Sequence, residues 1–332
     1  MMQVTTEEPL LTIGIPTYNR SDFLERLVKR LVSQIKGFNA EIFVCDDCST
    51  DDTIAVMDRL ILQNPDVAIR FVENESNLDF SRNFNKTIKQ SRGKFVLLMA
   101  NDDSIDDGVL PLVMDILERH SDIALGFLAS QDYDNALEKP AAPFVPGEDK
   151  YYEHGMDLIR EIRCCVPCLI SGWILRKEYW LAEAREEYMA SNALQIPIGM
   201  KLLAKYPCYC HRSTPAIRYR TAGGTCGVSG NPLWPYSGLN AYFHGARVMK
   251  GVYSDELYRS IYFQAVRTTC GHTIRCKVLG LPFRLEESEA LLKPYFDYEW
   301  PCCIWTVLLR LLLRLPRWVL YVPFRWLVPE KM

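Results

Sequence analysis

The sequence lacks the features that mark several common protein classes. It contains neither a Gly-x-x-x-x-Gly-Lys-Ser/Thr phosphate loop nor a Gly-x-Gly-x-x-Gly dinucleotide fingerprint. The stretch from Met1 to Pro9 is polar and acidic, unlike the basic and then apolar start of a secretory signal. The net charge of −3 over 332 residues argues against a general nucleic-acid binder. We therefore expect an intracellular protein outside these classes.

The 12 cysteines raise the alternative of a zinc protein. Three groups resemble ligand pairs: Cys45-x-x-Cys48, Cys165-x-x-Cys168 and Cys208-x-Cys210-His211. They lack the regular spacing of a zinc ribbon or finger, and Cys45 lies in an apolar run. We favour reduced structural thiols.

Apolar runs alternate with segments of helical periodicity through the first half of the chain. The runs at 10–16, 41–46, 68–73, 94–100, 123–130 and 169–175 predict strands. Helices are predicted between them, the first of them capped by Ser21 and ended by Gly37. This alternation predicts an α/β fold with a Rossmann-like, mostly parallel sheet flanked by helices.

Changes in composition suggest the domain organisation. Residues 135–149 are rich in Pro and Ala and predict a surface loop, and 221–230 predict a flexible one. Residues 236–278 are predicted to be helical. We expect a catalytic domain over 1–230, with halves at 10–134 and 150–230, then a helical region over 231–300 and a tail over 301–332.

Polar clusters follow the predicted strands, at the edge where ligands bind in parallel sheets. Asp102 and Asp103 are adjacent carboxylates, which repel one another unless a cation or hydrogen bonds offset their charge. Mg²⁺ or Mn²⁺ bridging them to a diphosphate is the functional interpretation, and helix capping is the alternative. Asp46 and Asp47 form a second pair, which would bind a nucleoside or cap the next helix.

The combination of motifs resembles family 2 glycosyltransferases with the GT-A fold. The matching strings are Thr12-Ile13-Gly14-Ile15-Pro16-Thr17-Tyr18-Asn19-Arg20, Val44-Cys45-Asp46-Asp47-Cys48-Ser49-Thr50-Asp51-Asp52-Thr53, Asn77 with Arg82-Asn83, and Asn101-Asp102-Asp103. They occur in consistent order within residues 11–130.

The resemblance implies a role for each matched position. The residues assigned to the nucleotide-sugar donor are Pro16, Thr17, Tyr18, Asn19, Asp46, Asp47, Asn77, Arg82, Asn101 and Asp102. Among them, Asp47 would hold the base and Asp102 would face the ribose or sugar. Asp103 would bind Mn²⁺ or Mg²⁺, although Asn101 departs from the family's Asp-x-Asp motif.

The resemblance also implies inversion at the anomeric carbon, which requires a general base. The family takes this base from a Glu-Asp motif in the second half, but residues 188–224 contain no Asp or Glu. Asp132 and Asp134 are our candidates. The other candidates are Glu183, Glu186 and Glu187, which we interpret as a solvated helix face. His211 is a further candidate, which we interpret as structural.

The tail from Pro301 to Val328 is apolar but interrupted by arginines and prolines, so it does not read as a membrane span. Arg310, Arg314 and Arg317 share one helical face. This pattern predicts a helix lying on the cytoplasmic face of a membrane, with packing on the protein as the alternative. A lipid-linked glycan acceptor would suit such a peripheral, monotopic location.

We therefore expect an inverting glycosyltransferase that uses a UDP- or dTDP-sugar in surface polysaccharide synthesis. One alternative is a nucleotidyltransferase, which would need a Gly-rich basic loop that Pro16-Thr17-Tyr18-Asn19 does not supply. Another is a catalytically degenerate subunit that binds a nucleotide sugar at the membrane.

Overall fold

The computed structural model describes residues 8–141, 143–162, 166–167, 169–189, 193–220 and 250–261, with short pieces at 274, 277–278, 307, 311, 314–316 and 318–319. The chain divides into two compact units. The first holds residues 1–157, 169–189 and 202–221, and the second holds 158–168, 190–201 and 222–332. The boundary predicted at 230 and most of the helical region predicted at 236–278 lie outside the described residues.

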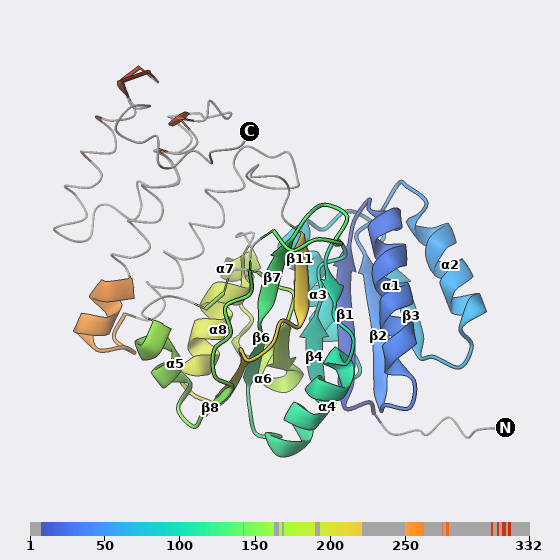
Figure 1. The fold of residues 1–332 in the computed structure, drawn as a ribbon, viewed down its shortest axis with the longest axis horizontal. Helices are drawn as coiled ribbons and strands as arrows, with labels where there is room; N and C mark the ends of the chain where they lie inside the picture. Colours follow the sequence, from blue (N-terminus) through green and yellow to red (C-terminus); the bar gives the residue numbers. More distant parts are fainter. Residues whose placement is uncertain are drawn as a thin grey trace. The chain divides into compact units, whose positions relative to one another are not determined.

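The first unit is built on an eight-stranded sheet with the order β3-β2-β1-β4-β9-β6-β10-β8 (Figure 1). Its strands are β1 (Leu11–Thr17), β2 (Ala40–Asp46), β3 (Ile69–Glu73), β4 (Phe95–Leu98), β6 (Leu125–Leu128), β8 (Lys150–Tyr152), β9 (Trp173–Arg176) and β10 (Cys208–His211). β1 pairs in parallel with both β2 and β4. β9 lies antiparallel between β4 and β6, and β8 is antiparallel to β10. The predicted mostly parallel α/β sheet is confirmed.

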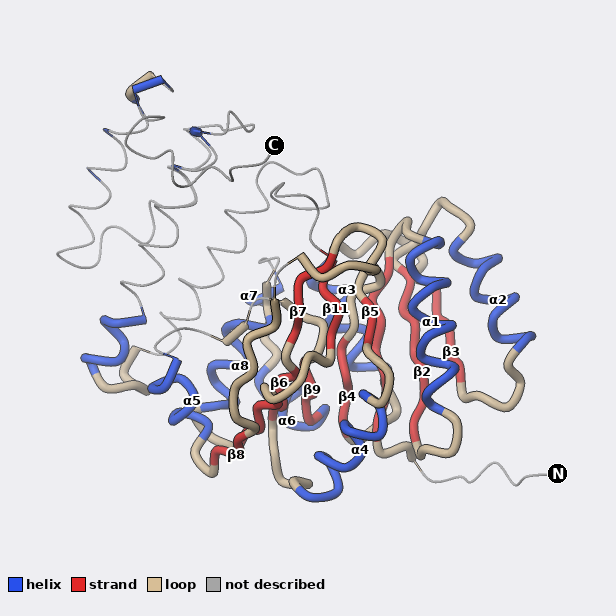
Figure 2. The backbone as a smooth tube through the Cα atoms, viewed as in Figure 1, coloured by secondary structure: helices blue, strands red, loops and turns tan. Residues whose placement is uncertain are grey.

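Helices cover both faces of this sheet (Figure 2). In the view of Figure 1, α1 (Ser21–Ile35), α2 (Thr53–Gln63) and α4 (Val109–Arg119) lie in front, and α3 (Phe80–Gln90) lies behind. The other helices are α5 (Gly155–Ile162), α6 (Lys177–Glu183), α7 (Glu186–Met189) and α8 (Gln195–Leu203). Leu24, Leu27, Val28 and Leu31 are buried because they recur on one face of α1. Gly37 follows that helix with φ +87°, a left-handed conformation that suits glycine at a helix end.

A second sheet of three strands has the order β5-β11-β7. Its strands are β5 (Ser104–Ile105), β7 (Ser130–Tyr133) and β11 (Ile217–Arg220). The single strand predicted over 123–130 is therefore split, because the chain passes at Ala129 from β6 in the large sheet to β7 in the small one. The carbonyl of Ala129 accepts hydrogen bonds from the N–H groups of Ala216 and Ile217. This crossing brings β11 beside β5, directly after Asp102 and Asp103.

Candidate functional site

The carboxyl ends of β2, β1 and β4 meet at one edge of the large sheet. The register pairs Thr17 with Asp46, and the N–H of Asp47 donates to the carbonyl of Thr17 at 2.9 Å. On the other side, Asn101 Nδ2 donates to Thr17 Oγ1 at 2.7 Å. The predicted polar clusters are therefore neighbours in space, with Thr17 between the other two.

The loops after β1 and β2 are bonded to each other through Asn19. Its side-chain oxygen accepts the N–H of Thr50 at 2.7 Å, and its own N–H donates to Ser49 Oγ at 2.8 Å. Asn19 has φ +49°, a left-handed conformation that Asn adopts more readily than most residues. Asn19 thus braces the loops, whereas Tyr18 beside it is 46% exposed.

Asp46 and Asp47 have different surroundings. Asp46 is buried and closes its own turn, since its two oxygens accept the N–H of Ser49 at 2.8 Å and the hydroxyl of Ser49 at 2.5 Å. Burial raises the pKa of the Asp46 carboxyl, although the Ser49 hydrogen bonds oppose the rise. In Asp47, Oδ1 accepts both Asn74 Nδ2 and the N–H of Leu78 at 2.8 Å. Asp47 is buried as well, at 3% exposed, and these hydrogen bonds fix its carboxylate.

Two buried asparagines support Asp47, and neither has a role predicted from the sequence motifs. Asn83 Oδ1 accepts Asn74 Nδ2 at 3.0 Å, and Asn83 Nδ2 donates to the carbonyl of Cys45 at 3.1 Å. This chain of amides runs from α3 to β2. Only the position of Asn83 beside Arg82 in the motif gave any signal of it.

Of two further donor-binding predictions, Asn77 precedes α3 and Arg82 lies in its first turn. Asn77 Oδ1 accepts the N–H of Asp79 at 3.0 Å, so Asn77 shapes the turn before the helix. Arg82 forms a 2.7 Å ion pair with Glu186 of α7, and both side chains are substantially exposed. Arg82 is therefore accessible, but it has a protein partner.

Asp102 and Asp103 are also held differently. Asp102 forms an ion pair with Arg20. Asp103 is 5% exposed, and its Oδ2 accepts the hydroxyl of Ser171 at 2.5 Å while its Oδ1 accepts the N–H of Arg220 at 3.0 Å. Burial, followed by the charge of Asp102, raises the pKa of Asp103 to about 7, against the opposing effect of these hydrogen bonds.

The carboxylates of Asp102 and Asp103 suit a hard divalent cation that takes most of its ligands from water and substrate. Among the residues that the structure describes, no group of three His, Cys, Asp or Glu side chains could hold a metal by itself. Mg²⁺ and Mn²⁺ can bind through one or two carboxylates together with water and substrate phosphates. The geometry favours Asp102 as the direct ligand. Asp103, the predicted ligand, is more buried and accepts one hydrogen bond on each carboxylate oxygen, and its role as a metal ligand stays a prediction.

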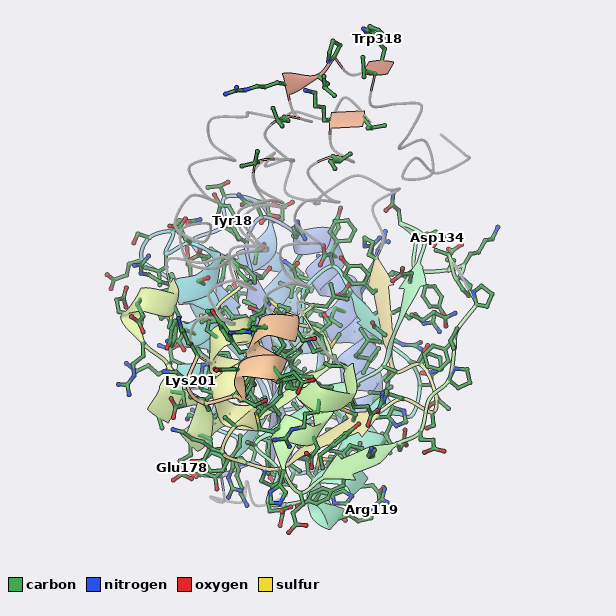
Figure 3. All side chains as sticks on the ribbon, turned by 90° about the vertical axis from the view of Figure 1, so that its left-hand side faces the viewer. Tyr18, Arg119, Asp134, Glu178, Lys201 and Trp318 are labelled. Atoms are coloured by element: carbon green, nitrogen blue, oxygen red, sulfur yellow. The ribbon has the colours of Figure 1, made fainter. Side chains whose placement is uncertain are left out.

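The candidate bases receive uneven support. Asp134 Oδ1 accepts the N–H groups of Glu138 and Lys139 at 2.9 and 3.3 Å. These hydrogen bonds lower the pKa of Asp134, which weakens it as a base. Asp134 also lies well away from Tyr18 in Figure 3. Asp132 is exposed on β7.

The other groups considered have structural partners. His211 is buried, with its ring nitrogens 2.9 Å from Asp149 Oδ2 and 3.0 Å from Thr214 Oγ1. Glu183 pairs with Lys205.

The cysteine groups give no support for zinc within the described residues. Cys45, Cys48, Cys208 and Cys210 are not joined in disulfide bonds. Burial raises the pKa of Cys45 to about 11 and raises that of Cys208 further, so these thiols stay protonated. Cys165 and Cys168 lie outside the described residues.

Known proteins resemble this chain in sequence and in fold. Residues 12–176 match glycosyl transferase family 2. The abequosyltransferase RfbV of Salmonella typhimurium is 28% identical over 213 residues, which cover 61% of this chain and 63% of RfbV. The chain therefore spans slightly less than two thirds of that relative's length.

Two solved structures share the fold. TarS 1-349 of S. aureus in complex with UDP-GlcNAc has a TM-score of 0.55 and 16% identity, covering 95% of this chain and 91% of TarS 1-349. The mannosyltransferase PcManGT of Pyrobaculum calidifontis, in complex with GDP-Man and Mn²⁺, has a TM-score of 0.53 and 15% identity, covering 98% of this chain and 89% of PcManGT. The chain belongs to glycosyl transferase family 2 and has the GT-A fold.

Proposed function

We propose that the protein transfers a sugar from a nucleotide sugar to an acceptor hydroxyl, with inversion at the anomeric carbon. The observation that carries the proposal is the pair Asp47 and Asp102 at the ends of β2 and β4, on either side of β1. Asp47 presents an acceptor for a base or ribose, and Asp102 lies where a diphosphate and its cation would follow. We favour a UDP- or dTDP-sugar; of the two structures that share the fold, TarS was solved with UDP-GlcNAc and PcManGT with GDP-Man.

The chain's own residues would bind the two ends of the donor differently. Pro16, Thr17 and Tyr18 would line the nucleoside with Asp47, while Arg20 and Arg82 would face the diphosphate as cations. Asp102 would hold Mn²⁺ or Mg²⁺, with Asp103 buried behind it. When bound, the metal would stabilise the negative charge on the departing nucleoside diphosphate.

A base must accept the acceptor's hydroxyl proton in a single displacement. Asp132 and Asp134 remain our candidates, and we favour Asp132 because backbone hydrogen bonds already occupy Asp134. Replacing each with Asn tests this role. Unchanged turnover in both variants would remove both from the mechanism.

We propose that the tail attaches the protein to the cytoplasmic face of a membrane and that the acceptor is a lipid-linked glycan. Val307, Leu311, Leu315 and Trp318 are exposed apolar side chains at helical spacing, and Trp318 is labelled in Figure 3. The interleaved Arg310, Arg314 and Arg317 suit anionic headgroups. Within the described residues no helix is long and apolar enough to cross a bilayer.

Release of nucleoside diphosphate from a panel of nucleotide sugars, with and without Mn²⁺, tests the proposed activity. We expect release from a UDP- or dTDP-sugar by the full chain, greatly reduced in Asp47→Asn and Asp102→Asn variants. Binding of a donor without turnover on any acceptor would indicate the degenerate subunit instead. Pyrophosphate production from a sugar phosphate and a nucleoside triphosphate would indicate a nucleotidyltransferase.

A further inference from the structure

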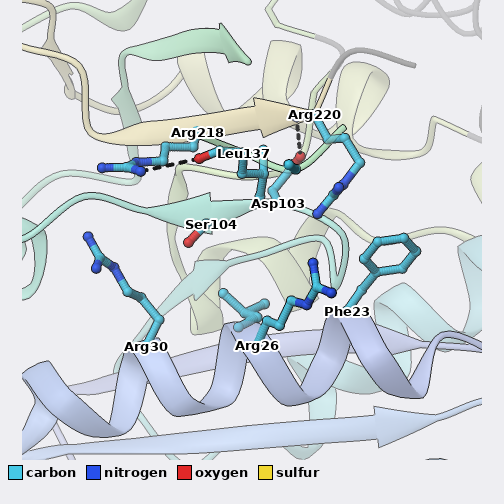
Figure 4. A pocket seen from close by; sticks show the side chains of 10 residues that line it. Phe23, Arg26, Arg30, Asp103, Ser104, Leu137, Arg218 and Arg220 are labelled. Carbon is cyan, nitrogen blue, oxygen red and sulfur yellow. Dashed lines mark hydrogen bonds between the residues drawn. The ribbon is translucent and has the colours of Figure 1, made fainter. Parts of the chain in front are cut away.

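A cavity of about 170 Å³ lies between α1, the start of β5, and β11 (Figure 4). Its charged and aromatic lining consists of Phe23, Arg26, Arg30, Asp103, Arg218 and Arg220. We call this cavity the arginine pocket. It reaches Asp103 from the side of α1, and neither Thr17 nor Asp47 lines it. It is therefore distinct from the proposed nucleoside site.

The four arginines of the arginine pocket are not equally neutralised. Arg218 is paired with Asp106 at 2.5 Å, and Arg30 with Asp107 at 3.2 Å. In the described part of the chain, no carboxylate forms an ion pair with Arg26 or Arg220. The pocket therefore carries more positive than negative charge.

Arg220 is rigidly held at the inner wall. The residue is 6% exposed. Its Nε donates to the carbonyl of Asp102 at 2.8 Å, and its guanidinium lies 4.4 Å from the centroid of the Phe23 ring. Burial, with the nearby charges of Arg26 and Arg20, lowers the pKa of Arg220, against the charges of Asp102 and Asp103. Arg26 is exposed on α1 and points toward the same space in Figure 4.

We propose that the arginine pocket binds a phosphoryl group between Arg26 and Arg220, as an anion site separate from the nucleoside site. A guanidinium fixed by an aromatic ring and a carbonyl leaves its terminal N–H groups in place for an anion, and guanidinium pairs well with phosphate oxygens. An exposed second guanidinium at the entrance can close on the ligand. A bound dianion would also relieve the repulsion between the two arginines.

The pocket is connected to the candidate metal carboxylates through Arg220. The backbone N–H of Arg220 is bonded to Asp103, and its side chain is bonded to Asp102. Occupation of the pocket would therefore act on the residue that holds this segment in position. A free phosphate and a lipid phosphate headgroup present the same chemistry, so the source must be found by experiment.

The test measures the binding of inorganic phosphate to the full chain by calorimetric titration in metal-free buffer. We expect saturable binding by the wild type that is about ten-fold or more weaker in Arg26→Gln, because a charge-assisted bond to phosphate is lost. Lys29→Gln is the matched control, since it removes one positive charge from the same helix and Lys29 pairs with Glu25. Asp47→Asn should leave phosphate binding unchanged, which separates this site from the nucleoside site.

A second arm uses vesicles of phosphatidylcholine with and without phosphatidic acid. If the source is a headgroup, Arg26→Gln should weaken binding to the phosphatidic acid vesicles more than Lys29→Gln does. Equal loss in Arg26→Gln and Lys29→Gln in both arms, or no saturable binding of either probe, would overturn the proposal. Phosphate binding is measured here without donor or acceptor, so failure of this proposal would leave the proposed glycosyl transfer to its own assay, the release of nucleoside diphosphate.

Discussion

Arg20, which follows β1, and Asp102, which follows β4, form an ion pair across 82 residues of sequence. The pair neutralises the carboxylate that we propose as the metal ligand. A metal and a diphosphate would therefore have to exchange partners with Arg20, the cation moving to phosphate and the metal to Asp102. This exchange links metal binding to the presence of the donor.

Replacing Arg20 with Gln should tighten the binding of Mn²⁺ to the nucleotide-free protein. A partly exposed ion pair contributes about 0–1 kcal/mol, which corresponds to at most about a five-fold change in affinity. Electron paramagnetic resonance of free Mn²⁺ measures this directly. Arg59→Gln, which breaks an exposed pair with Glu25 on α1, is the control. If Asp102→Asn binds Mn²⁺ as the wild type does, Asp102 is not the ligand.

Asp103 should make the protein less stable as pH rises from about 4 to 7. Its pKa is raised from 3.8 to about 7 in the folded state, so over this range the folded protein retains a proton that the unfolded chain has released. The contribution is at most about 1.4 kcal/mol per pH unit. Urea unfolding at a series of pH values should give a shallower slope for Asp103→Asn. An identical slope in wild type and variant would contradict the raised pKa.

Replacing Ser171 with Ala should move the same transition to higher pH. The hydroxyl of Ser171 donates to Asp103 and lowers its pKa, so its loss should raise the pKa further. The same unfolding series detects the shift. A shift toward lower pH would mean that burial is not the main cause of the raised pKa.

Asp47→Asn and Asp46→Asn should have opposite phenotypes. In Asp47 the Oδ2 acceptor is replaced by a donor, so nucleotide affinity should fall about 10- to 100-fold, the effect of about 1.4–3 kcal/mol for a lost hydrogen bond to a charged group. Asp46 bonds only within its turn to Ser49, so its variant should lose stability and keep nucleotide affinity. Calorimetric titration with UDP and thermal unfolding distinguish the two. Equal nucleotide affinity in Asp47→Asn and wild type would remove the proposed role.

Arg82→Gln and Glu186→Gln break the same exposed ion pair and should leave the unfolding temperature almost unchanged, since such pairs contribute less than about 1 kcal/mol. Their effects on donor binding should differ. Arg82→Gln should raise the KM for the donor several-fold, whereas Glu186→Gln should leave it unchanged or lower it by releasing Arg82. Equal effects of both variants would mean that Arg82 serves only the ion pair.

Removal of residues 301–332 should shift the protein from the membrane fraction to the soluble fraction of a lysate. Replacing Arg310, Arg314 and Arg317 with Gln should give a partial shift, because each basic residue near an anionic surface contributes about 1 kcal/mol. Fractionation followed by immunodetection measures both. An unchanged distribution after truncation would refute the membrane attachment.

The architecture, and the edge of the large sheet that carries the site, were predictable because both follow from local sequence patterns. Apolar periodicity marked β1, α1 and β2, and the carboxyl ends of parallel strands necessarily share an edge. The antiparallel insertion of β9 carried no such local signal, since pairing direction depends on the whole path of the chain. Ser171 and Arg220 lie next to β9 and at the end of β11, so their contacts with Asp103 were not predictable.

Prediction from the sequence was also limited where two adjacent residues are of the same type. Nothing in the sequence distinguishes a buried Asp103 from an accessible Asp102, because that difference arises from Ser171 and β11 closing over one of them. The start of α1 shows the same limit. Ser21 was predicted to cap the helix, but Arg20 occupies the cap position and Ser21 is the first helical residue. The N–H of Ser21 donates to Asp51 Oδ2 from the next loop at 2.9 Å.

The bridge from Asn19 to Ser49 and Thr50 has a consequence for the thermodynamics of binding. Because the two loops are already ordered by their mutual hydrogen bonds, a nucleotide that binds beside them loses little affinity to the conformational entropy of fixing backbone. Ordering that accompanies folding does not have to be repeated with every catalytic cycle. This edge of the sheet is therefore preorganised, and we expect nucleotide association there to be fast and close to rigid-body docking.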